Sequence, residues 1–153
     1  MDAVAYIDAA VIEFVNKNLI PIRIPADDPL LAPRFLIKWT PTLLILDKEG
    51  VAHDKNVGFF WPQELIPCLL LGMGKTHFDQ PDRTTACSCF EQIINSYPSS
   101  SQAPEAIYLS GVARYIEGHD VASLIEIYDR LKSDYPDSQW LMRAYPYRLL
   151  KKK

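Results

Sequence analysis

Cysteine is the residue type of this sequence with the greatest potential for covalent chemistry. The chain contains three, Cys68, Cys87 and Cys89. Dithiol redox chemistry needs a Cys-x-x-Cys pair at a helix N-terminus, where the helix dipole lowers the pKa of one thiol. No Cys-x-x-Cys occurs in the 153 residues. Cys87 and Cys89 are two residues apart on an expected helix, so their side chains point about 200° apart and are predicted to be small packing residues.

Two other patterns are incomplete forms of ligand-binding motifs. The segment Gly72-Met73-Gly74-Lys75-Thr76 ends like a phosphate-binding loop, but Leu69 stands where the motif requires its first glycine. His53, His77 and His119 are scattered, with no cysteine or carboxylate at zinc-ligand spacing. The sequence therefore predicts no catalytic residue, no metal site and no cofactor in this chain.

The composition is that of a globular protein. Hydrophobic residues make up 48% and charged residues 23% of the chain, and the formal net charge is −3. Nucleic-acid binding is not expected from this charge. The longest apolar stretch, Leu65 to Met73, is too short to cross a membrane, and no export signal is visible. An odd number of cysteines fits a reducing compartment, so a cytoplasmic location is expected, unless the true N-terminus lies upstream of Met1.

The first half of the chain is predicted to alternate short helices and strands. Asp8 is expected to cap a helix whose apolar side lies within residues 11–15. Leu19 to Ile24 has isoleucine at every second position and is predicted to be a strand. Pro21 inside this segment cannot donate a ladder hydrogen bond, so the strand is expected at a sheet edge. Leu30 to Phe35 is predicted to be a short helix.

Residues 42–58 carry the strongest strand signals. The apolar run from Thr42 to Asp47 predicts a strand buried on both faces. Asp47 to Gly50 has turn composition, so Val51 to Val57 is expected to pair back as a hairpin. A helix is predicted to begin near Pro62, to kink or start late at Pro67, and to end at Gly72 or Gly74.

The second half is predicted to be helical and contains an internal repeat. Residues 90–100 align with residues 128–138 at an offset of 38, since 128 − 90 = 38, and both copies contain Tyr-Pro followed by serine. The proline stops one helix, and a serine or aspartate begins the next. Helices are predicted over roughly residues 81–97, 102–117, 120–135 and 138–149. Gly118 is expected to be a C-cap and Asp120 an N-cap.

The passage Trp39-Thr40-Pro41-Thr42-Leu43-Leu44-Ile45-Leu46-Asp47, with the Lys48-Glu49-Gly50 turn and Gly58, resembles the thioredoxin-like family. The resemblance covers residues 1–75 and implies an incomplete α/β thioredoxin-like domain, without the first strand and the start of the active-site helix. It also implies that Pro41 is cis, with Trp39, Thr40 and Pro41 facing the substrate. Residues 76–153 resemble an all-α, tetratricopeptide-type array of helical hairpins, with a period four residues longer than the usual ~34.

If the chain begins at Met1, the segments 19–24 and 42–47 lack the central strand that separates them in the family. Backbone groups left unpaired in this way must be satisfied elsewhere. Strand exchange in a homodimer would satisfy them, and so would direct pairing of the two surviving strands.

Two functions from different classes fit these observations. The first is a non-catalytic thioredoxin-fold and tetratricopeptide-like module that binds a protein or peptide, with no nucleic-acid or membrane partner. The second is a thiol-disulfide oxidoreductase in cell redox homeostasis, whose Cys-x-x-Cys lies upstream of Met1. Helical spacing alone predicts that the aromatic residues of the repeat are core, but four are also candidates for a partner groove: Tyr108, Tyr115, Tyr128 and Trp140.

Overall fold

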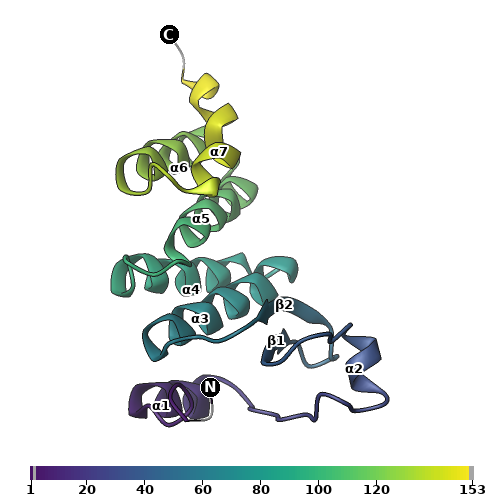
Figure 1. The fold of residues 1–153 in the computed structure, drawn as a ribbon. Coiled ribbons are helices and arrows are strands. Elements are labelled where there is room, and N and C mark those ends of the chain that lie inside the picture. The colour runs from purple at the N-terminus through teal and green to yellow at the C-terminus, as the bar shows by residue number, and fades with distance from the viewer. Residues whose placement is uncertain (2, 152–153) are drawn as a thin grey trace.

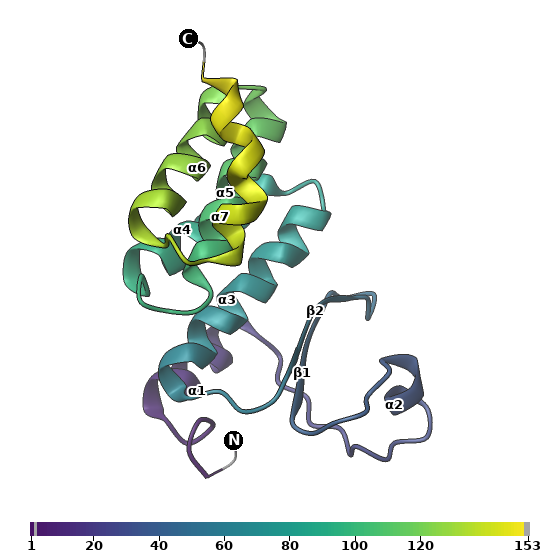
Figure 2. The ribbon, with the colours of Figure 1, turned by 45° about the horizontal axis from the view of Figure 1, so that its top comes forward.

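The computed structural model describes residue 1 and residues 3–151. A β-hairpin and two short helices are followed by a stack of helices that rises in sequence order (Figure 1). Figure 2 shows α3 between the hairpin and the stacked helices. The elements are α1 (Ala9–Asn18), α2 (Leu31–Arg34), β1 (Thr42–Leu46), β2 (Ala52–Val57), α3 (Pro62–Asp79), α4 (Arg83–Ser96), α5 (Ala103–Gly118), α6 (Val121–Asp134), α7 (Gln139–Ala144) and the 3-10 helix η1 (Tyr145–Leu150).

Helix α1 begins as predicted at Asp8. The Asp8 carboxylate accepts hydrogen bonds from the backbone N–H groups of Ala10 and Val11, at 3.0 and 3.2 Å. Val11 is buried, and α1 packs against α3. Ile12 was expected on the same apolar side but is 44% exposed. The buried side of α1 is therefore narrower than the sequence pattern indicated.

Residues 19–24 do not form the predicted strand. The segment belongs to no strand, and Ile20 and Ile22 are 89% and 75% exposed. In the described part of the chain, the only sheet consists of β1 and β2, so the direct pairing of segments 19–24 and 42–47 is also absent. The alternation of isoleucines was a correct sign of extended backbone, but a strand also requires a partner edge.

The hairpin forms as predicted. β1 and β2 are antiparallel, with Thr42 opposite Val57 and Ile45 opposite Asp54. The Asp47 carboxylate holds the turn by accepting the N–H groups of Glu49 and Val51, and Gly50 adopts a φ of 75°. The prediction that β1 is buried on both faces is wrong: Ile45 is 6% exposed, but Leu46 is 37% exposed.

Helix α2 confirms the short helix predicted over Leu30 to Phe35. The Asp28 carboxylate accepts the N–H groups of Leu30 and Leu31, just before and at the first residue of this helix. The Lys55 ammonium group of β2 donates to the carbonyl oxygens of Phe35 and Leu36, at 2.8 Å each. These bonds attach the end of α2 to the hairpin.

Helix α3 continues through Gly72 and Gly74 to Asp79, so the predicted end of this helix is wrong. Both glycines provide room for a neighbour: a Cβ at Gly72 would overlap Ile45, and a Cβ at Gly74 would overlap the ring of Phe90. The hairpin packs at the first glycine and α4 at the second. The predicted boundary between residues 75 and 76 falls within α3, and the division into two domains stays a prediction.

The repeat in the second half is reproduced in the hydrogen bonds of its turns. The N–H groups of Ser100 and Ser138 donate to the carbonyls of Tyr97 and Tyr135, at 3.0 and 3.1 Å. Each serine hydroxyl then accepts the N–H group two residues further on, at 3.1 Å. Each of these turns therefore leads into the helix that follows it, as predicted.

The predicted caps between α5 and α6 are half correct. Asp120 is the N-cap of α6 and accepts the Ala122 N–H at 2.9 Å. The C-cap of α5 is His119, in the left-handed conformation with a φ of 50°, and Gly118 is the last helical residue. Glycine was expected at the cap because it adopts positive φ without a steric cost.

The contact between α5 and α6 resembles the contact of Gly74 with Phe90 between α3 and α4. A Cβ at Gly111 of α5 would overlap Ile127 of α6, as one at Gly74 of α3 would overlap Phe90 of α4. The two partners are 16 residues apart in both cases, since 90 − 74 = 16 and 127 − 111 = 16. α3–α4 and α5–α6 thus share one kind of close contact at a glycine, at an offset of 37 residues (111 − 74 = 37), one less than the offset of the Tyr-Pro turns.

The substitution Gly74→Ala is expected to lower the free energy of unfolding by about 1–3 kcal/mol, because the added methyl group forces Phe90 or α4 to move. Gly118→Ala is the matched control: a Cβ there meets no atom within 4 Å. This control is expected to be neutral or stabilising by up to ~1 kcal/mol. Urea denaturation measures both, and equal stability of the two variants would contradict the close contact.

Candidate protein-interaction surfaces

The residues predicted to face a substrate lie at the start of β1. Trp39 is 71% exposed, Thr40 and Pro41 are also exposed, and the Thr40–Pro41 peptide bond is cis, as predicted. The Trp39 carbonyl accepts the Thr42 hydroxyl at 2.6 Å, and the Pro41 carbonyl accepts the Gly58 N–H at 2.8 Å. A hollow of about 340 Å³ adjoins this corner, lined by Ala26, Ile37, Lys38, Trp39 and Thr40.

Two further aromatic residues lie at the same end of the hairpin. Phe59 and Trp61 follow β2, are 45% and 61% exposed, and contact each other edge to face with ring centroids 5.1 Å apart. The sequence reasoning did not include them. Their signal was the run Phe59-Phe60-Trp61 after Gly58, because large aromatic residues on a loop are candidates for binding. We refer to Trp39, Thr40, Pro41, Phe59 and Trp61 as the hairpin-end surface.

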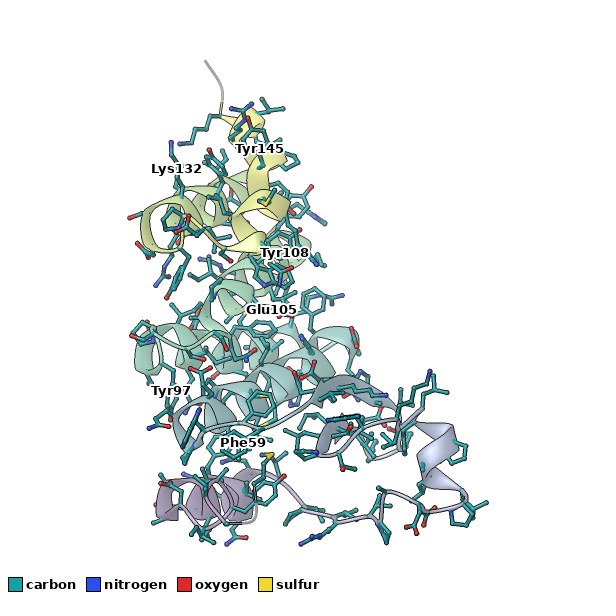
Figure 3. The ribbon with its side chains drawn as sticks, in the orientation of Figure 1. Phe59, Tyr97, Glu105, Tyr108, Lys132 and Tyr145 are labelled. Carbon is teal, nitrogen blue, oxygen red and sulfur yellow. The ribbon has the colours of Figure 1, made fainter. Side chains whose placement is uncertain are left out.

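Tyr108 and Trp140, two of the four groove candidates, lie together between α5 and α7. Their ring centroids are 5.1 Å apart, and Tyr147 of η1 stacks on Tyr108 at 5.9 Å. Figure 3 labels Tyr108 on the helical stack. The hydroxyl groups of Tyr108 and Tyr147 are hydrogen-bonded at 3.0 Å. Burial, together with this hydrogen bond, raises the pKa of Tyr147. The three rings are half-buried and pack the end of the helical stack.

The other two groove candidates lie elsewhere. Tyr115 contacts His119 at the end of α5, and Tyr128 of α6 contacts Tyr145 of η1. All four candidates are partly buried and pack against the core cluster, so helical spacing correctly indicated packing. Their ring contacts among the described residues fall into three separate groups, and their role in partner binding stays a prediction.

Lys75 belongs to the segment that resembles the end of a phosphate-binding loop. Its ammonium group bonds to Asp54 of β2 at 2.9 Å and to Glu105 of α5 at 2.7 Å. Burial alone would lower the pKa of Lys75, but the hydrogen bonds to Glu105 and Asp54 outweigh it and the pKa is raised. Lys75 therefore joins the hairpin to the helical stack, and its charge is already paired.

His53 forms a second polar contact between the hairpin and α3. Its Nε2 atom lies 2.9 Å from the Asp47 carboxylate and its Nδ1 atom 2.7 Å from that of Asp79. The hydrogen bond to Asp47, then that to Asp79, raises the pKa of His53, and the bond to His53 lowers the pKa of Asp47. Among the described residues, no group of three or more His, Cys, Asp or Glu side chains could hold a metal ion.

The cysteines are free and lie within the helical packing. Cys68 is buried, and burial raises its pKa to about 12, with a further contribution from the charge of Asp54. Burial likewise raises the pKa values of Cys87 and Cys89. Cys87 lies with its Sγ atom 3.9 Å from the Ser110 carbonyl oxygen. A raised pKa disfavours the thiolate form. The surroundings of these three thiols therefore do not activate them as redox nucleophiles.

Residues 69–100 match the family model for the tetratricopeptide repeat. The match begins within α3 and ends just after α4, so it covers the first of the two helical hairpins. No curated protein and no solved structure matches the chain. The resemblance of residues 1–75 to thioredoxin-like proteins gains no support from these comparisons. No helix in the described part of the chain is long and apolar enough to span a membrane.

The substitution His53→Gln is expected to lower the free energy of unfolding by about 1–3 kcal/mol near pH 6, by removing charge-assisted hydrogen bonds. Because the pKa of His53 is raised on folding, its contribution is complete below about pH 6.5 and is lost as the pH rises through the folded-state value. The stability difference between wild type and variant, measured by urea denaturation from pH 5.5 to 9, should shrink with rising pH. A stability difference that does not change with pH would contradict the contribution of protonated His53.

Thiol labelling at pH 8 should distinguish the three cysteines. Cys87, the least buried, is expected to react first with a disulfide reagent, and Cys68 and Cys89 only as the protein unfolds. Peptide mapping after timed labelling gives the order. Rapid reaction of Cys68 in the folded protein would contradict its burial.

Proposed function

We propose that this chain is a non-catalytic protein-interaction module, in which a thioredoxin-like platform carries a short tetratricopeptide-type helical repeat. The observation that supports this function best is the pair of helical hairpins, α3–α4 and α5–α6, the first of which matches the tetratricopeptide repeat. Such arrays present extended surfaces to proteins and peptides. Of the side chains that could do chemistry, Lys75 and His53 are paired with carboxylates, and Cys68 and Cys89 are buried.

The hairpin-end surface is the proposed binding site. It exposes three aromatic rings, those of Trp39, Phe59 and Trp61, whereas the aromatic groove candidates of the repeat are used largely in packing. Exposed aromatic residues are enriched among binding hot spots, because a rigid ring buries much area at little entropic cost. The partner chemistry that fits is an apolar peptide segment that covers these rings.

Peptide display against the purified chain tests this proposal. Enriched peptides are expected to be apolar, and Trp39→Ser should weaken the binding of a selected peptide by at least tenfold, the order expected for a hot-spot residue. Leu149→Ser is the matched control, since Leu149 is 74% exposed at the other end of the molecule. If both variants bind as the wild type does, Trp39 is not part of the site.

A second candidate function is thiol-disulfide exchange in a longer form of the protein. The passage Trp39-Thr40-Pro41-Thr42, through which the chain resembles the thioredoxin-like family, favours it. The reaction needs a Cys-x-x-Cys upstream of Met1. Intact-mass measurement and N-terminal sequencing of the protein from its native cells would detect such an extension. Residues 1–153 alone are expected to be inactive in a disulfide-reduction assay.

A further inference from the structure

The last helical segment of the chain, α7 with η1, lies in a part of the sequence that carries an excess of positive charge. Residues 139–153 contain two arginines and three lysines but no aspartate or glutamate, so their formal charge is +5. Because the whole chain has a formal charge of −3, residues 1–138 together carry −8, since −3 − 5 = −8. Lys151 pairs with Asp129 of α6 at 2.7 Å and so neutralises an acidic side chain at this end. One end of an acidic protein is therefore basic.

The outer side of this segment is also apolar. Met142 and Leu149 are 78% and 74% exposed, and Tyr145 is 48% exposed. Each residue of an α-helix advances by about 100° and each residue of a 3-10 helix by about 120°, so these three side chains lie within about 120° of one another around the axis. The buried Ala144 and the half-buried Tyr147 lie on the opposite side, against the core cluster. A terminal helix of a helical array normally presents a polar outer side to water, and this one does not.

Two arginines flank these apolar side chains and stack on aromatic rings. The Cζ atom of Arg143 lies 4.5 Å from the centroid of the Trp140 ring, and that of Arg148 lies 3.8 Å from the centroid of the Tyr145 ring. Both arginines are exposed, and no described carboxylate forms an ion pair with either. A stacked guanidinium keeps N–H donors free at its edge, where they match the oxygens of a phosphate or carboxylate group. We refer to Met142, Arg143, Tyr145, Arg148 and Leu149 as the C-terminal face.

We propose that the C-terminal face docks on the surface of a lipid bilayer that contains anionic phospholipids. Arg143 and Arg148 contact the anionic groups of the lipid headgroups, and Met142 and Leu149 enter the boundary between the headgroups and the acyl chains. The sequence led us to expect no membrane partner because no segment could span a bilayer, but a peripheral contact requires no spanning helix. The same surface repels the negative charge of residues 1–138, which orients the molecule with α7 and η1 toward the bilayer.

The shape of this end favours a bilayer over a peptide as the partner. Peptides bind in grooves or along sheet edges, where the protein covers them from more than one side. The C-terminal face is instead the outer side of one helical segment, which stands at the far end of the stack from the hairpin (Figure 1). A broad surface covers such a face in a single contact. The chain then has a peptide site at one end and a membrane contact at the other.

Co-sedimentation of the full 153-residue chain with phospholipid vesicles tests the proposal. The chain is expected to bind vesicles of phosphatidylcholine that contain about 30% phosphatidylserine, and to bind vesicles of phosphatidylcholine alone at least tenfold more weakly, the order expected for the loss of two or more cation contacts. Raising the salt concentration to about 0.5 M should release the chain, because salt screens the attraction between the arginines and the headgroups.

Two double variants with the same change in net charge locate the contact. Arg143→Gln with Arg148→Gln should weaken vesicle binding on the order of 25-fold, at about fivefold for each cation near an anionic surface. Lys17→Gln with Lys38→Gln is the matched control, since both lysines are exposed and belong to the opposite end of the molecule. This control should weaken binding by less than about twofold, because charges distant from the contact are screened.

A second pair of variants tests the apolar part of the contact. Leu149→Ser should weaken vesicle binding about tenfold, whereas Trp39→Ser, on the hairpin-end surface, should leave it unchanged. Circular dichroism checks that each variant is folded. The proposal is overturned if the chain binds neither kind of vesicle, or if the two double variants weaken binding equally. Binding of poly-L-glutamate without binding of vesicles would also overturn it, and would assign the C-terminal face to an acidic polypeptide.

Discussion

Close packing on opposite sides of α3 is the constraint on which the rest of the structure depends. Gly72 admits the hairpin through Ile45, and Gly74 admits α4 through Phe90. Two residues apart on a helix, these glycines face roughly opposite directions, so α3 is covered from both sides over the same turn. A side chain at Gly72 or Gly74 would have to displace Ile45 or Phe90 from its contact with α3. The ion pairs of Lys75 and the contacts of His53 then fix the orientation that this packing sets.

The sequence predicted the regular parts of this fold well, because their signals are local. Asp8 and Asp120 as caps, the Asp47 turn and the two Tyr-Pro turns depend on hydrogen bonds between residues close in the chain. The Gly72-Met73-Gly74 segment was misread as a helix end, since its role depends on Ile45 and Phe90, which are distant in sequence. The strand at 19–24 was also misread, because pairing depends on an edge that the segment itself does not specify.

The candidate surfaces were less predictable than the fold. Helical spacing indicated that Tyr108, Tyr115, Tyr128 and Trp140 are packing residues, and it could not show that they divide into separate contacts. The exposed pair Phe59 and Trp61 follows a glycine that reverses the chain beside Pro41, and this neighbourhood arises only from the register of the hairpin. A residue's exposure depends on what the rest of the chain fails to cover, and local periodicity carries little information about that.

Because α3 belongs to both the hairpin region and the helical stack, the molecule should unfold as one cooperative unit. A cut between residues 75 and 76 would divide a helix and remove Asp79 and Glu105, the partners of His53 and Lys75. Neither piece would retain its native packing surface. We expect the same continuity to link the two ends thermodynamically, so that a ligand that stabilised the hairpin would also reduce the local opening of α4 and α5. The two dissimilar halves of the sequence thus share one helix, α3.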